Sequence, residues 1–539
     1  MKRRLVVMLL CFAMLVSSLA GCASTDKKTD VSSKQETTSG ENEEANGEIA
    51  LDHFAGTTIK IVYVRREGEK SQSQNEKLAF KMAEEATGIH VEWIELESGA
   101  AADKVAVMLA SDEQPDAYWA CINEGTLVQN EDLWYDLSEE GLLETYAPDL
   151  KAQYDANGVW DYLEFQDGSI YGFMTGEFAS PKYKWTASPL WINTDWLDKV
   201  GMDVPTTADE FYEVLCAFRD NDVDGDGDPN NEIPLSFCSG YWQASVMMLA
   251  NAFGIGGDPH WMDEKAYKML ENGEVKSTVD TDNYRAFLEF YHKLIEEGLM
   301  DVEGFSQTSD QYDAKVNAKL VGAFCYDSAA LNGMIDSYVP FTFQGIEGVD
   351  PRITGGVNRF AGQRSNFVIT ADSENVEAVV HWWNYLSSTT EMKYITYCGE
   401  EGILWERDEE GNFWRTTNPN TDATEFDLGV GNYAPAVFAG EEMDTEEILP
   451  GRKAQYDWID ENIDYIPKEL FPTKYTDAES EEERAAMEIE LFDYIVNFTA
   501  TSIMNGVTDE SWEQHLKDLK AVQYYDWLQW YQDYMDGTL

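Results

Sequence analysis

The feature that most constrains the fold is an acidic run in which glycine alternates with aspartate, DVDGDGD at residues 222–228. Carboxylates on alternate positions repel one another, and the interleaved glycines adopt backbone angles that other residues avoid, so this run cannot continue a helix. A calcium ion removes the repulsion, because it takes about six to eight oxygen ligands and a loop of this spacing wraps around it. The run therefore predicts a calcium-binding turn.

Numbering the loop from its first aspartate predicts the ligands. They are Asp222, Asp224, Asp226, the Asp228 carbonyl, Asn230 and Glu232. The EF-hand pattern has a glutamate at position 12, whereas here Glu232 is at position 11 and Ile233 at position 12. Which carboxylate completes the shell therefore stays open, and the alternative is a solvated acidic turn without metal. The ion is expected to be structural, since it closes a helix-to-strand turn and leaves no open coordination position.

The segments around this loop predict regular structure on both sides. Thr207 with Glu210 forms a capping-box pattern at a helix start. Four apolar residues at helical spacing follow and predict one buried face: Phe211, Val214, Leu215 and Phe218. Strands are expected at residues 190–192 and 233–237, so the loop connects a helix to a core strand.

The N-terminus predicts a lipoprotein leader rather than part of the fold. Residues 2–4 are basic, residues 5–20 are apolar or small, and LAGC ends the segment at Cys22. Cys22 is therefore the expected lipidation site, and residues 1–22 are the signal peptide. A lone membrane anchor or plain secretion is the alternative. Residues 23–54 contain almost no large apolar side chains and predict a flexible tether.

The rest of the chain predicts two α/β lobes. With 539 residues the chain is too long for one ordinary core. A strand at 57–64, a helix with Leu78, Met82 and Ala86 on one face, and a strand at 89–94 follow in order, which favours a parallel sheet. Residues 168–185 are rich in Gly, Pro and Tyr and predict the first crossing between the lobes.

An ordered set of short motifs resembles a known family. In the stretch 188–237 these are NTDWL, GMDVPTT, the aspartate loop and EIPL; elsewhere they are DGSIYG at 167–172, KVNAKLVGAF at 315–324 and CGEEG at 398–402. Together they resemble the extracellular solute-binding proteins (family 1) of ABC importers over residues 57–410. More narrowly, they are similar to the long lipoprotein branch that binds oligosaccharides and has a calcium loop in one lobe.

The resemblance implies a fold and the residue ranges of its two lobes. The expected architecture is the two-lobe fold of periplasmic binding proteins, in which each lobe is a mixed or parallel sheet flanked by helices, with a hinge between the lobes. Residues 55–175 and 355–404 are expected in the first lobe, and residues 176–354 and 405–539 in the second. Three tryptophans near the C-terminus are expected to pack against the second lobe: Trp512, Trp527 and Trp530.

Candidate ligand contacts come from the ends of the predicted strands. Ligands of parallel sheets bind at the carboxyl ends of the strands, which selects Arg65 after the first strand and Trp119 after the third. A surface arginine and a core tryptophan are the alternative interpretations. The remaining candidates lie in the crossing or follow strands of the second lobe: Trp185, Tyr241, Trp242, Tyr326 and Asp327.

Composition excludes some partners and leaves the catalytic question open. A net charge of −63 repels nucleic acid and anionic lipid, so the only membrane contact expected is the lipid anchor. The six histidines show no metal-ligand spacing, and the HExxH, GxSxG and P-loop motifs are absent. With 101 acidic residues, a pair of carboxylates is uninformative about glycoside hydrolysis. Cys216 and Cys238 flank the loop and could pair, although free thiols are favoured.

The sequence thus predicts a non-enzymatic, monomeric receptor on the extracellular face of a bacterial cytoplasmic membrane. It would capture an oligosaccharide or another small solute by hinge closure and deliver it to ABC permease subunits. The aromatic content of 13% suits a sugar, since C–H faces stack on rings. Two alternatives stay open, a secreted carbohydrate-active enzyme and a receptor for peptides or amino sugars.

Overall fold

The computed structural model describes most of the chain after the leader and tether. The described residues are 49–66, 68–71, 73–111, 113–177, 184–186, 188–228, 231–239, 241, 244–256, 267–326, 334–357, 361–407, 409, 411, 413–416, 420–435, 450–469, 471 and 474–539. Cys22 and the tether up to residue 48 lie outside them. Among the described helices, none combines the length and the apolar character needed to cross a bilayer.

The first sheet is mixed and has the strand order β2-β1-β3-β13-β4. Its strands are β1 (Thr58–Arg65), β2 (His90–Glu97), β3 (Ala117–Trp119), β4 (Phe173–Glu177) and β13 (Ala361–Ile369). The strand β1 pairs in parallel with β2 and β3, as the strand–helix–strand pattern predicts, and β13 pairs antiparallel with β3 and β4. The three parallel strands therefore end at one edge, at Arg65, Glu97 and Trp119.

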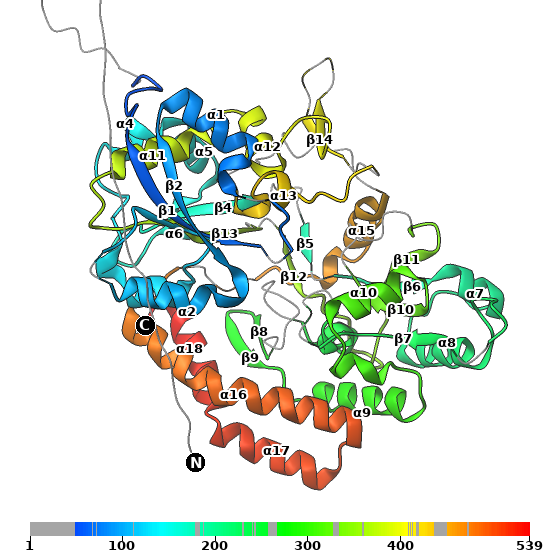
Figure 1. The fold of residues 1–539 in the computed structure, drawn as a ribbon. Helices are drawn as coiled ribbons and strands as arrows, with labels where there is room; N and C mark the ends of the chain where they lie inside the picture. The colour runs from blue at the N-terminus through cyan, green and yellow to red at the C-terminus, as the bar shows by residue number, and fades with distance from the viewer. Residues whose placement is uncertain are drawn as a thin grey trace, which may run out of the picture. The chain divides into compact units, whose positions relative to one another are not determined.

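Helices cover this first sheet, to the left in Figure 1. They are α1 (Leu78–Thr87), α2 (Ser98–Leu109), α3 (Glu124–Gln129), α4 (Leu142–Tyr146), α5 (Pro148–Asn157), α6 (Trp160–Leu163), α11 (Val376–Tyr385), α12 (Thr390–Cys398) and α13 (Glu425–Leu428). Helix α1 is present where a helix was predicted, but it buries a face rotated from the predicted one. Ala79, Phe80 and Ala83 are buried, whereas Leu78 and Met82 are only half-buried.

The second sheet has the order β11-β6-β10-β7, and its strands are β6 (Leu190–Asn193), β7 (Ile233–Leu235), β10 (Val321–Cys325) and β11 (Tyr338–Phe341). The strands β7 and β10 are parallel, and β6 is antiparallel to β10 and β11. Around it lie α7 (Thr194–Val200), α8 (Ala208–Asp220), the 3₁₀ helix η3 (Val246–Phe253), α9 (Asp282–Glu296), α10 (Ser309–Asn317) and the hairpin β8 (Lys268–Glu271)–β9 (Glu274–Ser277). The α/β fold with two helix-flanked sheets is confirmed.

The chain crosses between the two sheets on paired short strands. Strand β5 (Lys184–Thr186) lies between β4 and β6 in sequence, and β12 (Gly355–Val357) lies between β11 and β13. The two pair antiparallel, with Gly356 opposite Trp185, and Figure 1 shows them between the sheets. The crossing expected near Trp185 is therefore part of a two-stranded connection, which is what a hinge between lobes requires.

The C-terminal region packs mainly on the second sheet. It contains α15 (Pro450–Glu461), α16 (Ala478–Asn505), α17 (Asp509–Ala521) and α18 (Tyr524–Asp536). Trp512, Trp527 and Trp530 share one apolar cluster with side chains of β6, β7 and β10, as predicted. Helix α16 lies alongside α9 (Figure 1) and contributes Leu491 and Ile495 to that cluster.

One expected boundary is corrected by the packing. Residues 405–435, which include the hairpin β14 (Trp405–Arg407)–β15 (Phe413–Arg415), were expected in the second lobe. Trp405, Val430 and Ala434 instead belong to the apolar cluster of the first sheet. Backbone bonds reinforce this assignment, since the Gly176 N–H donates to the Ala434 carbonyl and the Val430 N–H to the Thr396 carbonyl.

Candidate functional site

The acidic loop closes on itself as a cation-binding turn would. Carboxylate oxygens of Asp222, Asp224 and Glu232 lie within 4.8 Å of one another. The Asp222 carboxylate accepts from the backbone N–H groups of Gly225 (2.8 Å) and Gly227 (3.1 Å), and both glycines have positive φ. Glu232 Oε1 accepts from the Val223 N–H at 3.0 Å, so Glu232 returns to the start of the loop.

Two buried oxygens in this loop lack a hydrogen-bond partner among the described residues, Glu232 Oε2 and Asn231 Oδ1. A buried acceptor without a partner is costly, and a bound cation is one way to satisfy it. The residues therefore fit a hard divalent cation. Asp226 is turned differently, because its carboxylate accepts from the Asp228 N–H and from Asn231 Nδ2, each at 2.7 Å. Asn230 lies outside the described residues.

The edge after β1 carries a dense polar cluster built around Arg65. Its guanidinium donates to the backbone carbonyls of Glu69 and Ser71, and Nη1 lies 3.7 Å from Glu95 Oε2. Behind it, the fully buried pair of Lys77 and Glu69 is 2.8 Å apart. Burial lowers the pKa of Lys77, and Glu69 opposes that shift. The Arg65 side chain thus lies in a cluster in which positive and negative charges balance. It is not an isolated surface arginine.

Several polar atoms of this cluster have unused bonding capacity. Glu95 Oε2, Gln74 Oε1 and the Tyr63 hydroxyl are buried without a hydrogen-bond partner among the described residues. Burial, followed by the nearby Glu69, raises the pKa of Tyr63, so its hydroxyl keeps its proton and can donate. Tyr63 and Gln74 are 0% exposed, so these unpaired atoms lie beneath the strand-end edge and not on its surface.

Trp119 is a core residue, which corrects its expected contact with a ligand. The side chain is 0% exposed. Its ring packs edge to face on Tyr63 at 5.5 Å and on Trp383 at 4.9 Å, and Nε1 donates to the Tyr433 carbonyl at 2.9 Å. A ring enclosed in this way has no face left for a sugar in this structure.

The edge after β7 and β10 brings two predicted residues together. These strands are parallel, so Tyr241, which follows β7, and Tyr326, which follows β10, lie at the same edge. Both hydroxyls lie beside the carboxylate of Asp313 on α10. Burial raises the pKa of Asp313, and the two hydroxyls oppose the shift. Its Oδ1 has no hydrogen-bond partner among the described residues.

Asp313 was not predicted from the sequence, because one aspartate among 101 acidic residues carries no signal of its own. Its position could have indicated it, because Asp313 lies on α10, the helix that precedes β10. This places it next to Tyr326. Asp327 and Trp242 lie outside the described residues. Trp185 is placed only through its backbone in β5, and nothing follows for its side chain.

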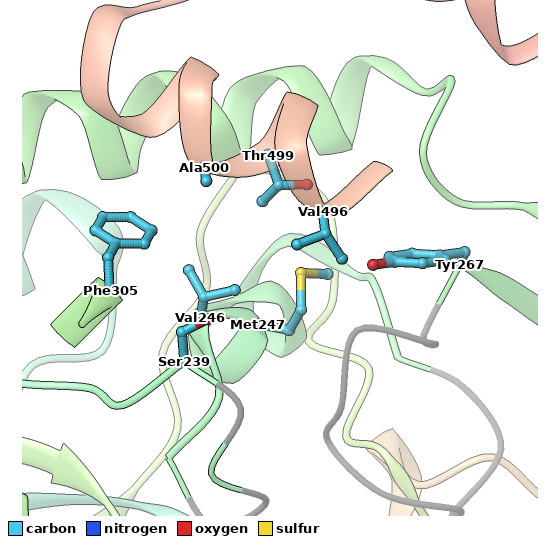
Figure 2. A pocket seen from close by; sticks show the side chains of 8 residues that line it. All are labelled: Ser239, Val246, Met247, Tyr267, Phe305, Val496, Thr499 and Ala500. Carbon is cyan, nitrogen blue, oxygen red and sulfur yellow. The ribbon is translucent and has the colours of Figure 1, made fainter. Parts of the chain in front are cut away.

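A small apolar cavity lies elsewhere, between η3 and α16 (Figure 2). Val246, Met247, Phe305 and Val496 supply most of its wall. The volume open to the centre of a water molecule is about 20 Å³, room for roughly one water. The cavity is too small for a sugar ring and belongs to the packing of α16.

The comparison with known proteins identifies the family. The sequence profile of the bacterial extracellular solute-binding proteins matches residues 70–393. The chain belongs to this family. The strand-end edges described above are therefore candidate contact surfaces of a solute-binding protein.

Two relatives of this solute-binding protein and one solved structure are informative. The fructooligosaccharide ABC transporter substrate-binding protein FusA of Streptococcus pneumoniae is 29% identical over 483 residues, 86% of this chain and 87% of FusA. The solved structure of a FusA EF-hand mutant with fructo-nystose has a TM-score of 0.77 at 25% identity, covering 89% of this chain and 99% of that one. The lipoprotein LipO of Bacillus subtilis is 28% identical over 253 residues, 45% of each chain.

Proposed function

We propose that this solute-binding protein captures an oligosaccharide and delivers it to the membrane subunits of an ABC importer. The observation that carries the proposal is the similarity to FusA along 86% of the chain, since FusA is named for fructooligosaccharide transport. The paired crossing strands β5 and β12 agree with it, because two lobes joined in this way can close on a ligand. The protein would release its solute unchanged and act as a monomer.

The two strand-end edges would supply complementary contacts. Asp313 would offer a carboxylate to adjacent sugar hydroxyls, and Tyr241 would offer an aromatic ring to a C–H face. Tyr326 is 4% exposed and stacks on Tyr312, so it would support Asp313 through its hydroxyl. Arg65 and Glu95 offer a donor and an acceptor on the first lobe. Trp185, Trp242 and Asp327 stay in the proposal as contacts expected from the sequence.

The acidic loop would bind calcium as a structural ion. Asp222, Asp224 and Glu232 would ligate it through carboxylates, as their convergence and the unpaired Glu232 Oε2 favour. Bound there, calcium would neutralise the repulsion of the loop and fix the turn between α8 and β7. Asp226, the Asp228 carbonyl and Asn230 stay as expected additional ligands.

The protein would be anchored through a lipid on Cys22 at the extracellular face of the cytoplasmic membrane. Cys22 ends a leader of lipoprotein type, and LipO, a relative over part of the chain, is named a lipoprotein. The tether would then keep the binding domain outside the bilayer. No nucleic-acid partner is proposed for a chain of net charge −63.

Thermal unfolding with a saccharide panel tests the proposal. Kestose, nystose, raffinose, maltotetraose and mannopentaose are each added to the protein, together with glucosamine and a tripeptide. A bound saccharide at about a hundred times its Kd should stabilise the fold by about 2.7 kcal/mol and raise the melting temperature. A shift with glucosamine or the tripeptide alone would favour a receptor for amino sugars or peptides. Chromatographic detection of cleavage products would favour an enzyme.

Asp313→Asn locates the site. Hydrogen bonds to a charged group contribute about 1.5–3 kcal/mol, so calorimetric affinity for the bound saccharide should fall at least roughly tenfold. Asp310→Asn is the matched control, because it makes the same change on the same helix at an exposed position. Equal affinity of the Asp313 and Asp310 variants would remove Asp313 from the site.

A further inference from the structure

The C-terminal helix α16 is a further connection between the two lobes, beyond the crossing strands β5 and β12. Its 28 residues make it about 42 Å long. From its midpoint onward, Leu491, Ile495 and Ile503 are buried in the apolar cluster of the second sheet. At its start, Glu481 is almost buried, and its Oε1 lies near Gly125 of α3, a helix of the first lobe. The helix is thus fixed in one lobe and reaches the other.

Tyr475, two residues before the N-cap Asp477, is inserted into the first lobe. It is 2% exposed and belongs to an apolar cluster formed by β1, β3 and α3. Its hydroxyl donates to Ser365 Oγ on β13 at 2.7 Å. Its ring stacks on Phe165 with centroids 4.2 Å apart and an angle of 18°. Insertion of a tyrosine with both faces and the hydroxyl in use defines a specific contact.

Arg364 covers the other face of that ring. Its guanidinium carbon lies 3.8 Å from the Tyr475 ring centroid. Nε and Nη2 donate to the two carboxylate oxygens of Glu124 at 3.1 and 2.7 Å, a bidentate geometry that fixes the guanidinium plane. We call the four residues Glu124, Arg364, Ser365 and Tyr475 the C-terminal latch.

Two features indicate that this latch can be released. Ser365 has a φ of +48°, a conformation that residues other than glycine rarely adopt, and it lies where the β13–β4 register shifts. Arg364 Nη1 is buried without a hydrogen-bond partner among the described residues. The contact thus contains a strained backbone residue and an unsatisfied hydrogen-bond donor. Such a contact is not optimised for a single conformation of the lobes. In the sequence, Ser365 follows the crossing strand β12, which ends at Val357, by eight residues.

We infer that the C-terminal latch sets the position of the two lobes by tying the start of α16 to β13 and α3. The crossing strands β5 and β12 form only a short two-stranded connection, about which the lobes can rotate. A long helix that packs in one lobe and contacts the other restricts that rotation. Opening or closing of the lobes therefore requires the contacts of the C-terminal latch to break or to shift. The inference follows from the architecture; its effect on solute affinity rests on the proposed function.

The test compares Tyr475→Phe with Tyr154→Phe in the full-length protein without ligand. Tyr475→Phe keeps the ring stack and removes only the hydroxyl that reaches Ser365. Tyr154→Phe removes an equally buried hydroxyl, which donates to the Met174 carbonyl within the first lobe at 3.0 Å. Arg364→Lys is a second latch variant, since lysine keeps the charge and loses the bidentate geometry.

Small-angle scattering and scanning calorimetry give the readout. The wild type and Tyr154→Phe should each unfold in one transition, with the same radius of gyration. The latch variants should show a larger radius of gyration and two resolved transitions, one for each lobe. If Tyr475→Phe does not fold, Arg364→Lys decides the outcome. Latch variants that match Tyr154→Phe in both measurements, or a wild type that already gives two transitions, would overturn the inference. Neither measurement uses a sugar, so failure of the proposed function is seen separately.

Discussion

His515 is the most strongly perturbed histidine among the described residues. Its ring stacks on Phe498 at 3.7 Å with an angle of 6°, Nδ1 meets the Tyr494 hydroxyl at 2.9 Å, and Nε2 lies 2.9 Å from the Val279 carbonyl. Burial lowers its pKa to about 4, although the Val279 carbonyl, Asp280 and Asp518 oppose the shift. The folded protein therefore favours the neutral imidazole.

This perturbation predicts acid sensitivity with a defined sign. In the unfolded chain the pKa is about 6.5, so the contribution of His515 is full above that pH and is lost as the pH falls towards 4. The difference of about 2.5 units corresponds to about 3 kcal/mol. His515→Gln should flatten the dependence of the unfolding free energy on pH between 6.5 and 4, measured by urea denaturation. Parallel pH profiles of wild type and variant would contradict this.

Sequence reasoning at this scale selected residues at strand ends but could not rank how exposed their side chains are. Arg65 and Trp119 were selected by one argument, that they follow parallel strands. The structure buries Trp119 because Tyr63, Phe80 and Trp383 surround its ring, and these neighbours come from distant parts of the chain. Tyr326 and Tyr241 were selected in the same way and meet at Asp313. Side-chain direction at a strand end depends on packing that one local pattern does not contain.

At the scale of elements, the helix, loop and strand between Thr207 and Leu235 were predicted most closely. Thr207 accepts from the Glu210 N–H at 3.2 Å, and the predicted apolar stripe is buried along α8. Only half of the capping box forms, since the Glu210 carboxylate returns to the Thr206 N–H at 2.8 Å instead of to Thr207. Local patterns are reliable here because caps and apolar periodicity act within a few residues.

The aspartate loop predicts a calcium-dependent stability. Adding calcium to metal-free protein should raise the melting temperature by mass action, and Glu232→Gln should remove most of that rise because it deletes one of three converging carboxylates. Glu213→Gln makes the same change at an exposed position of the adjacent α8 and should keep the full response. Differential scanning fluorimetry with calcium and with chelator measures both. A full response in Glu232→Gln would exclude that carboxylate from the site.

Connections between elements were predicted less well than the elements. The return to the first lobe after residue 355 was expected and is realised in β13, whereas residues 405–435 were assigned to the wrong lobe. Their placement depends on Trp405, Val430 and Ala434, which meet side chains far away in sequence. Cys216 and Cys238 are both free thiols, which was favoured over a disulfide between them. Long-range assignments of this kind need the three-dimensional packing.

At the scale of the whole molecule, the two-lobe architecture followed from length and motif order, but the route of the C-terminal region did not. The sequence placed Trp512, Trp527 and Trp530 on the second lobe correctly. It gave no sign that Tyr475, just before the same long helix, inserts into the first lobe. An isolated tyrosine in a polar segment has no periodicity, so its partner cannot be inferred from neighbouring residues.

The net charge of −63 predicts stabilisation by simple salt. Like charges on a compact surface repel, and the unfolded chain spreads them apart, so low ionic strength favours unfolding. The Debye length falls from about 30 Å at 0.01 M to about 10 Å at 0.1 M, so the melting temperature should rise over this range in sodium chloride with chelator present. Potassium chloride should give the same rise, because screening depends on ionic strength and not on ion identity. A melting temperature that falls with salt would instead show that the ion pairs of Arg65, Arg364 and Arg484 stabilise the fold by more than the general repulsion destabilises it.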